Sequence, residues 1–472
     1  MPPTPSSSSA LFAAHALLPA GWRDNVLLRW DDSGRLSDIH TTVSPPPDTP
    51  RARGPLIPGM PNLHSHAFQR AFAGLTEYRD TDSGADDSFW TWRDRMYRVA
   101  NSVTPEQLEA IATHLYIEML HAGYTAVCEF HYLHHDAGGG RYADPAEMSL
   151  RLVAAAQRAG IGLTLLPVLY QHAGFGAQPP RRDQRRFVNG VDTLLELVAR
   201  LRRECGAAGT AAALRVGVAP HSLRAVGPAA LRELLAGVVA IDPSMPVHLH
   251  IAEQEQEVHD CLGWSGQRPV QWLLANADVD ARWCLVHATH MTPAERDALA
   301  ASGAVAGLCP STEANLGDGV FDAAPYLAAG GAWGIGSDSH ASVDAAGELR
   351  LLETTQRLAQ RRRNVLASTT HPQLADHLWL GAVHGGARAA GRPIGGLAVG
   401  QQADFVVLDN RGALAGLTPA QMLASHVFAS AGRVVREVWV AGRARVVDGE
   451  HVLGGAACGA FVAARSDLLR GV

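Results

Sequence analysis

Four groups of histidines and acidic residues each follow an apolar run in the sequence. They are His64-Ser-His66, His248-Leu-His250 with Glu253, His287-Ala-Thr-His290 and Ser337-Asp338-Ser-His340. Residues i and i+2 leave the same face of a strand, so the two imidazoles of an HxH motif at a strand end can converge on one ion. We therefore predict one metal ion, with the ligands His64, His66, His250 and Asp338.

Three imidazoles and one carboxylate suit zinc, and we expect one Zn²⁺ per subunit, although Fe²⁺ or Mn²⁺ fits the same donors. A zinc ion lowers the pKa of a bound water from about 15.7 towards 7, so it makes a nucleophile at neutral pH. Glu253 follows a predicted ligand by three residues and is placed to move protons between water and a leaving group. His287 and Asp338 are further catalytic candidates, and the sequence leaves open which of the three takes the first proton.

Each of these residues also has a purely structural interpretation. Taken alone, His250 would be a core histidine, Asp338 a helix N-cap and Glu253 a surface ion-pair partner. The four predicted ligands follow three separate apolar runs, and that coincidence favours a metal site. His248 is interpreted as a residue of the protein interior or a support for the ligands.

The elements that must position these groups alternate regularly along the middle of the chain. Eight apolar runs occupy residues 56–63, 125–130, 163–169, 214–219, 246–251, 283–288, 305–309 and 333–337. Stretches with helical spacing lie between them, among them 104–120, 146–159, 191–203 and 228–239. Alternating strands and helices imply a parallel sheet, and eight of them predict a closed α/β barrel of the TIM-like (β/α)₈ type over residues 58–390. In such barrels the chemistry lies at the carboxyl ends of the strands, where the four groups occur.

The two ends of the chain have a different pattern. Residues 11–57 and 391–472 contain short strand-like segments with tight turns, including a predicted hairpin around Asp31-Asp-Ser-Gly-Arg. We predict that both ends combine into one small β-sandwich domain. Residues 1–10 are rich in proline and serine, and we expect them to be disordered.

The composition excludes several classes of protein. The chain has 472 residues and a net charge of −6, without the basic face of a nucleic-acid-binding protein. No stretch of about 20 apolar residues is long enough to span a membrane, and the start of the chain lacks the positive region of a signal peptide. The six cysteines form no CxxC pair, which is typical of a reducing compartment. We expect a cytoplasmic protein that binds neither nucleic acid nor membrane.

Several motifs resemble those of the amidohydrolase superfamily, in its deaminase and chlorohydrolase branch. They are Pro58-Gly-Met-Pro-Asn-Leu-His64-Ser-His66, His250-Ile-Ala-Glu253, Val286-His287, Gly336-Ser-Asp338 and the C-terminal segment 396–409. Segments 66–74, 89–93, 129–135, 174–180 and 220–226 are similar to the formimidoylglutamate deiminase family. This resemblance implies hydrolysis of N-formimidoyl-L-glutamate to N-formyl-L-glutamate and ammonia, a step of histidine degradation. It also implies a homodimer.

The substrate implied by the resemblance is a small dicarboxylate. Planar guanidinium groups bind carboxylates through two parallel hydrogen bonds, which makes Arg93 and Arg224 the candidate binding residues. Gln69, Tyr132 and His221 are candidates for further hydrogen bonds to the substrate. Without the resemblance, both arginines would be interpreted as members of structural or surface ion pairs. The four arginines within residues 181–186 are typical of a solvated face, with steering of an anionic substrate as the alternative.

The chain contains no lysine. Many two-metal members of this superfamily use a carboxylated lysine as a bridge, and that arrangement is impossible here. One metal ion is the simpler prediction, although a bridging glutamate or cysteine stays open.

Two other functions remain to be weighed. A related deaminase would act on an aminopurine, a pyrimidine or a nucleoside, which calls for apolar and aromatic slots rather than two arginines. A barrel of this type that had lost catalysis would serve as a binding scaffold, and its metal ligands would be broken. All four predicted ligands are present, which favours an enzyme.

Overall fold

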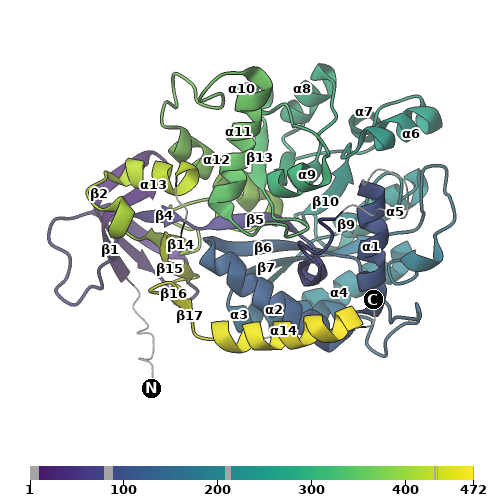
Figure 1. Ribbon diagram of the computed structural model, residues 1–472, viewed down its shortest axis with the longest axis horizontal. Helices are drawn as coiled ribbons and strands as arrows, with labels where there is room; N and C mark the ends of the chain where they lie inside the picture. Colours follow the sequence, from purple (N-terminus) through teal and green to yellow (C-terminus); the bar gives the residue numbers. More distant parts are fainter. Residues whose placement is uncertain (1–9, 79–88, 208–213, 430–431, 433, 471–472) are drawn as a thin grey trace.

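The computed structural model describes residues 10–78, 89–207, 214–429, 432 and 434–470. Figure 1 shows two parts, a sheet made from both ends of the chain and a larger body of parallel strands surrounded by helices. The prediction of disorder for residues 1–10 falls outside the described residues, except that Ala10 begins the first strand. Among the described helices, none combines the length and the apolar character needed to cross a membrane.

Parallel strands form the barrel that the sequence predicts. The strands are β5 (Met60–Ser65), β6 (Tyr124–His131), β7 (Gly162–Leu169), β8 (Leu214–Val216) with β9 (Ala219–Pro220), β10 (Val247–Ile251), β11 (Trp283–His287), β12 (Val305–Leu308) and β13 (Ala332–Ile335). They pair in the orders β5-β6-β7-β8 and β10-β11-β12-β13. Parallel bridges between Val218 and Val247 and between Ser65 and Asp338 join the two sheets. The predicted (β/α)₈ fold is confirmed.

Helices surround these strands. They are α1 (Phe89–Ser102), α2 (Pro105–His121), α3 (Glu147–Ala159), α4 (Val191–Ala207), α5 (Pro228–Ile241), α6 (Glu255–Ser265), α7 (Pro269–Asn276), α8 (Pro293–Ser302), α9 (Pro310–Leu316), α10 (Ala323–Ala328), α11 (Ala345–Gln360) and α12 (Leu374–Ala390). Short 3₁₀ helices η1 (Ala67–Ala71) and η2 (Arg182–Gln184) follow β5 and β7, and α1 lies beside both of them. Local sequence sets the ends of the longer helices. Thr104 caps α2 through the backbone N–H of Gln107, and Gly160 ends α3 in the left-handed conformation.

The terminal strands form one eight-stranded sheet. They are β1 (Ala10–Leu18), β2 (Gly21–Trp30), β3 (Leu36–Thr41), β4 (Leu56–Pro58), β14 (Phe405–Leu408), β15 (Val435–Val440), β16 (Arg443–Val447) and β17 (Glu450–His451). The order is β17-β16-β15-β14-β4-β1-β2-β3, and the antiparallel pair of β4 and β14 joins the two ends of the chain. The rings of Trp30, Phe405 and Trp439 pack together in its core. The predicted union of both termini is confirmed, and so is the hairpin of β2 and β3.

The last helices connect this sheet to the barrel. Helix α13 (Pro419–Phe428) packs on α11 and α12, and α14 (Gly454–Arg470) lies along α2 on the outside of the barrel (Figure 1). The ring of Phe461 stacks on that of His114 with 4.5 Å between centroids. The C-terminal end of the chain therefore contributes to both parts of the molecule.

Candidate active site

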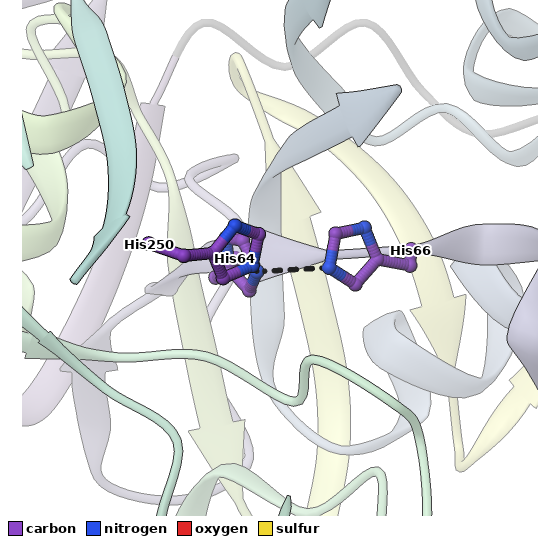
Figure 2. A group of neighbouring side chains, drawn as sticks. All are labelled: His64, His66 and His250. Atoms are coloured by element: carbon purple, nitrogen blue, oxygen red, sulfur yellow. Dashed lines mark hydrogen bonds between the residues drawn. The ribbon is translucent and has the colours of Figure 1, made fainter. Parts of the chain in front are cut away.

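Three imidazole rings converge at the carboxyl ends of two strands. His64 and His66 come from the end of β5, and His250 comes from β10 on the other side of the barrel (Figure 2). The Nε2 atom of His64 lies 3.1 Å from Nε2 of His66 and 3.0 Å from Nε2 of His250. All three rings are buried. The predicted histidines thus form one group whose nitrogens can reach a single metal ion.

The hydrogen bonds of the Nδ1 atoms show whether the Nε2 atoms, which face one another, carry hydrogens or lone pairs. Nδ1 of His66 lies 2.9 Å from the carbonyl oxygen of Phe130, and Nδ1 of His250 lies 3.1 Å from that of His221. A carbonyl only accepts hydrogen bonds, so each Nδ1 donates and each neutral ring has its lone pair on Nε2. Burial keeps the rings neutral, because it lowers the pKa of His66 to about 3 and those of the other two well below the ordinary value. Lone pairs this close repel unless a cation lies among them, so the donor set fits a divalent metal ion.

Asp338 completes this group from the segment after β13. Its Oδ1 lies 3.5 Å from Nε2 of His64 and 3.3 Å from Nε2 of His66. The backbone N–H of Asp338 donates to the carbonyl of His64, and the N–H of His66 donates to that of Asp338, so β5 and this segment are held together. Asp338 has a φ of +46°, a conformation that costs free energy and recurs at functional sites. Burial raises the pKa of its carboxyl to about 7.

Glu253 and His287 face this group from the neighbouring strand ends. Nε2 of His287 lies 3.6 Å from Oε1 of Glu253 and 3.8 Å from Oδ2 of Asp338. The pKa of His287 is raised to about 10, because the carboxylates around it, Glu253 first, outweigh the opposing effect of burial. The three predicted catalytic residues are therefore side by side, with the imidazole between two carboxylates.

A second group of possible ligands consists of His287, Cys309 and Asp338. Burial raises the pKa of the Cys309 thiol well above its ordinary value, and nearby carboxylates raise it further. Without a bound cation the thiol therefore keeps its proton. The three-histidine group with Asp338 contains the four ligands that the sequence predicts.

One pocket connects these residues to the predicted substrate-binding side chains. All of the predicted site residues line it except His64, which lies beneath it. Aromatic and apolar side chains that the sequence did not single out line the rest, namely Phe89, Trp92, Met96, Tyr97, Tyr170, Phe187 and Leu316. They belong to α1, to loops after the strands and, for Leu316, to the end of α9, where no spacing rule marks residues of a pocket.

The pocket is also lined by side chains that carry unpartnered hydrogen-bonding atoms. The Nε atoms of Arg93 and Arg224 are buried without a partner in the described part of the chain, as is Oε1 of Gln69. Nε2 of Gln69 donates to the hydroxyl of Tyr132 over 3.0 Å. Arg93 lies over the ring of Trp90, with 4.4 Å from the guanidinium carbon to the centroid. A buried donor without a partner raises the free energy of the folded protein, so this part of the pocket suits an acidic ligand that accepts hydrogen bonds.

Other predictions about single residues are also resolved. Nε2 of His248 lies 2.8 Å from the carbonyl oxygen of Ala389, so this ring is buried in a structural contact apart from the three-histidine group. Arg186 is fully buried and donates to the backbone carbonyls of Ala100, Val103 and His135. The interpretation of residues 181–186 as a solvated face is therefore wrong for Arg186. The five residues before it are polar, and no local pattern marks it as buried.

Sequence reasoning missed the buried glutamates that support the loops of this site. Glu129 accepts hydrogen bonds from the backbone of Ala67 and the hydroxyl of Ser65, the residues on either side of His66. Glu257 accepts from the backbone N–H groups of Ala252 and Glu253. Glu129 lies near the end of β6 and Glu257 lies in the first turn of α6, and these positions were the available signal.

Comparisons with known proteins agree with this geometry. Formimidoylglutamate deiminase of Pseudomonas aeruginosa is 54% identical over 462 residues, which cover 98% of this chain and 100% of that protein. The 8-oxoguanine deaminase of the same organism is 30% identical over 84% of this chain and 83% of its own length. The crystal structure of an amidohydrolase from Brucella melitensis superposes with a TM-score of 0.91 and 48% identity, over 98% of this chain and 100% of that chain.

A more distant structure shares the fold. It is a zinc-bound adenosine deaminase from Xanthomonas campestris, which superposes with a TM-score of 0.78 at 23% identity over 98% of each chain. The profile of the amidohydrolase family matches residues 56–445, most of the chain and all of the barrel. The chain belongs to the amidohydrolase family.

Proposed function

We propose that this chain is a hydrolase that converts N-formimidoyl-L-glutamate and water to N-formyl-L-glutamate and ammonia, with one zinc ion per chain. The observation that supports this most is the pairing of two features in one pocket. A buried group of three imidazoles and a carboxylate occurs together with two guanidinium groups whose Nε atoms are unpartnered in the described part of the chain. The 54% identity to a formimidoylglutamate deiminase over nearly the whole chain supports the same substrate.

His64, His66, His250 and Asp338 would hold the metal ion. A divalent zinc bound there acts as a Lewis acid and lowers the pKa of water towards about 7. The carbonyl oxygens that accept from Nδ1 of His66 and His250 orient these two rings towards the ion. The buried surroundings exclude bulk water and strengthen every charge interaction at this end of the pocket.

Arg93 and Arg224 would bind the two carboxylates of the glutamate skeleton. Bidentate arginine–carboxylate pairs fix the orientation of the ligand as well as its charge. Gln69 and Tyr132 are linked by a hydrogen bond, so the free Oε1 of Gln69 is held in place to accept from a substrate N–H. His221 lies beside His250, with 4.9 Å between ring centroids, and can donate to the substrate between the two ends.

Glu253, His287 and Asp338 are the side chains that take part in the proton transfers. Water adds to the formimidoyl carbon, the bond from that carbon to the terminal nitrogen breaks, and both water protons end on the departing nitrogen. Glu253 can accept a proton at Oε1 and return it to that nitrogen. Nε2 of His287 lies between Glu253 and Asp338, where it stabilises the charges that develop during the transfer.

An ammonia-release assay tests this proposal. The zinc-loaded protein is supplied with N-formimidoyl-L-glutamate in one series, and with guanine, 8-oxoguanine and adenosine in parallel series. We expect ammonia from the first substrate alone, in equal amount to N-formyl-L-glutamate. Release from a purine or a nucleoside without release from N-formimidoyl-L-glutamate would show that the substrate is wrong.

The aromatic lining is the observation that favours a purine as the second candidate. Phe89, Trp92 and Tyr97 would suit a planar base, and one relative is named as an 8-oxoguanine deaminase. Two guanidinium groups facing a neutral base would leave their donors unpartnered, which argues against it. A non-catalytic scaffold would give no ammonia from any substrate and would hold no metal.

The cytoplasmic location and the homodimer remain proposals. The six cysteines are all free, which is consistent with a reducing compartment. Light scattering of the purified protein would test the dimer, with a mass of about twice the chain mass of 50.1 kDa expected.

A further inference from the structure

A buried carboxylate stands behind His287, on the side away from the pocket. Glu313 lies in α9, and its Oε1 is 3.2 Å from Nδ1 of His287. The same Oε1 accepts a hydrogen bond from the backbone N–H of Cys309 over 2.8 Å, which fixes the position of the carboxylate. The side chain of Glu313 is 7% exposed, that of His287 is 1% exposed, and Glu313 does not line the pocket. Glu313 can therefore act on the reaction only through the imidazole.

The backbone of His287 is fixed, so the contact with Glu313 determines the orientation of its ring. His287 and Ala288 both have positive φ values, +67° and +50°, as the chain turns sharply at the end of β11. The N–H of Ala288 donates to the carbonyl of Ile251, which fixes the turn against β10. The remaining freedom is rotation of the ring about its side-chain bonds, and the Nδ1 contact with Glu313 restricts it.

We propose that Glu313 is a positioning residue that holds a hydrogen on Nδ1 of His287, so that Nε2 is the ring atom that faces Glu253 and Asp338 and stabilises the charges that develop there. An ionised carboxylate only accepts hydrogen bonds, so a ring nitrogen beside it must donate. Nε2 is then directed at Oε1 of Glu253 and Oδ2 of Asp338. The kinetic part of this proposal rests on the proposed deimination.

Helix α9 offers a matched control. Glu348 of α11 is equally buried and accepts hydrogen bonds from the backbone N–H and the hydroxyl of Ser311, in the first turn of α9. It supports the same helix, and no hydrogen bond or ion pair joins it to His287 in the described part of the chain. If loosening of α9 were the cause of a lower kcat, Glu348→Gln would lower kcat as well as the changes at Glu313.

The test compares zinc-loaded wild type, Glu313→Gln, Glu313→Leu and Glu348→Gln. The amide oxygen of Glu313→Gln can keep both hydrogen bonds and loses only the charge. In Glu313→Leu, which removes the acceptor, we expect kcat to fall about 10–100-fold with KM within about 3-fold and zinc content unchanged, and we expect a smaller loss in Glu313→Gln. Glu348→Gln is expected to stay within about 3-fold of wild-type kcat. Wild-type kcat in Glu313→Leu, or the same loss in Glu348→Gln, would overturn the proposal.

A second readout does not depend on substrate. Long-range ¹H–¹⁵N spectra of protein labelled at histidine nitrogens, with His287→Asn to assign the ring, report which nitrogen bears hydrogen. At an alkaline pH, where the ring is neutral, we expect hydrogen on Nδ1 in the wild type and in Glu313→Gln, and loss of that preference in Glu313→Leu. A neutral wild-type ring with hydrogen on Nε2 alone would contradict the proposal. If the wild type fails to act on N-formimidoyl-L-glutamate, the proposed function fails while this measurement still decides the role of Glu313.

Discussion

The two ends of the pocket are built from different parts of the fold. At the metal end, His64 and His250 lie on barrel strands and Asp338 lies just after one. At the carboxylate end, Arg93 lies on helix α1 and Arg224 lies in the loop after β9. The first end is fixed by backbone hydrogen bonds between neighbouring strands, whereas the second depends on side chains that pack on one another.

We expect this difference to make turnover and substrate recognition depend on different residues. Strand ends hold the imidazoles at a fixed spacing, which a metal ion requires. Helix and loop positions can vary in sequence without disturbing the barrel, so they are suited to choosing the substrate. Changes at the metal end should therefore lower kcat, and changes at the carboxylate end should raise KM.

The largest effect is expected from His250→Asn. Loss of one of three imidazoles should abolish zinc retention and lower kcat by about 10⁴-fold, because several kcal/mol of charge stabilisation disappear. Zinc analysis and steady-state ammonia release measure the two effects. The exposed His259→Asn serves as control, and zinc retention with normal turnover in His250→Asn would remove this residue from the site.

Glu253→Gln should lower kcat by about 10²–10⁴-fold, because a general acid–base group is lost. KM and zinc content should change little, since Glu253 is not among the predicted ligands. Glu255→Gln, two residues on and exposed, is the matched control. Near-normal kcat in Glu253→Gln would contradict its role as the proton carrier.

At the other end, Arg224→Ala should raise KM for N-formimidoyl-L-glutamate about 10–100-fold, the loss expected of a hydrogen bond to a charged group. The value of kcat should fall much less than in Glu253→Gln. Arg182→Ala removes an exposed arginine and is expected to have no effect. If Arg224→Ala and Arg93→Ala both keep wild-type kinetics, the substrate assignment is wrong.

The smallest effect is expected from Trp90→Leu. This change removes the ring under Arg93 and should raise KM about 2–5-fold, corresponding to about 0.5–1 kcal/mol for an interaction of a cation with an aromatic ring. In an Arg93→Ala background the same change should add nothing, because the interaction is already lost. An additive effect in the double variant would show that Trp90 acts without Arg93.

The sequence predicted the metal end of the site from spacing alone. The HxH motif of His64 and His66 and the position of Asp338 after the last run follow from strand periodicity and from the location of chemistry in barrels. Arg93 and Arg224 came only from resemblance, since an arginine on a helix or loop has no pattern that distinguishes binding from solvation. Glu313 was not found, because burial of a charged residue depends on tertiary contacts rather than on its neighbours in sequence.

The central claim is that a single cation among His64, His66, His250 and Asp338 serves the deimination. Titration of the metal-free protein with zinc, following bound metal and ammonia release from N-formimidoyl-L-glutamate together, tests it most directly. We predict that both signals rise in proportion and saturate at about one zinc per chain. Full turnover without metal, or turnover that begins only after a second zinc is bound, would contradict this account.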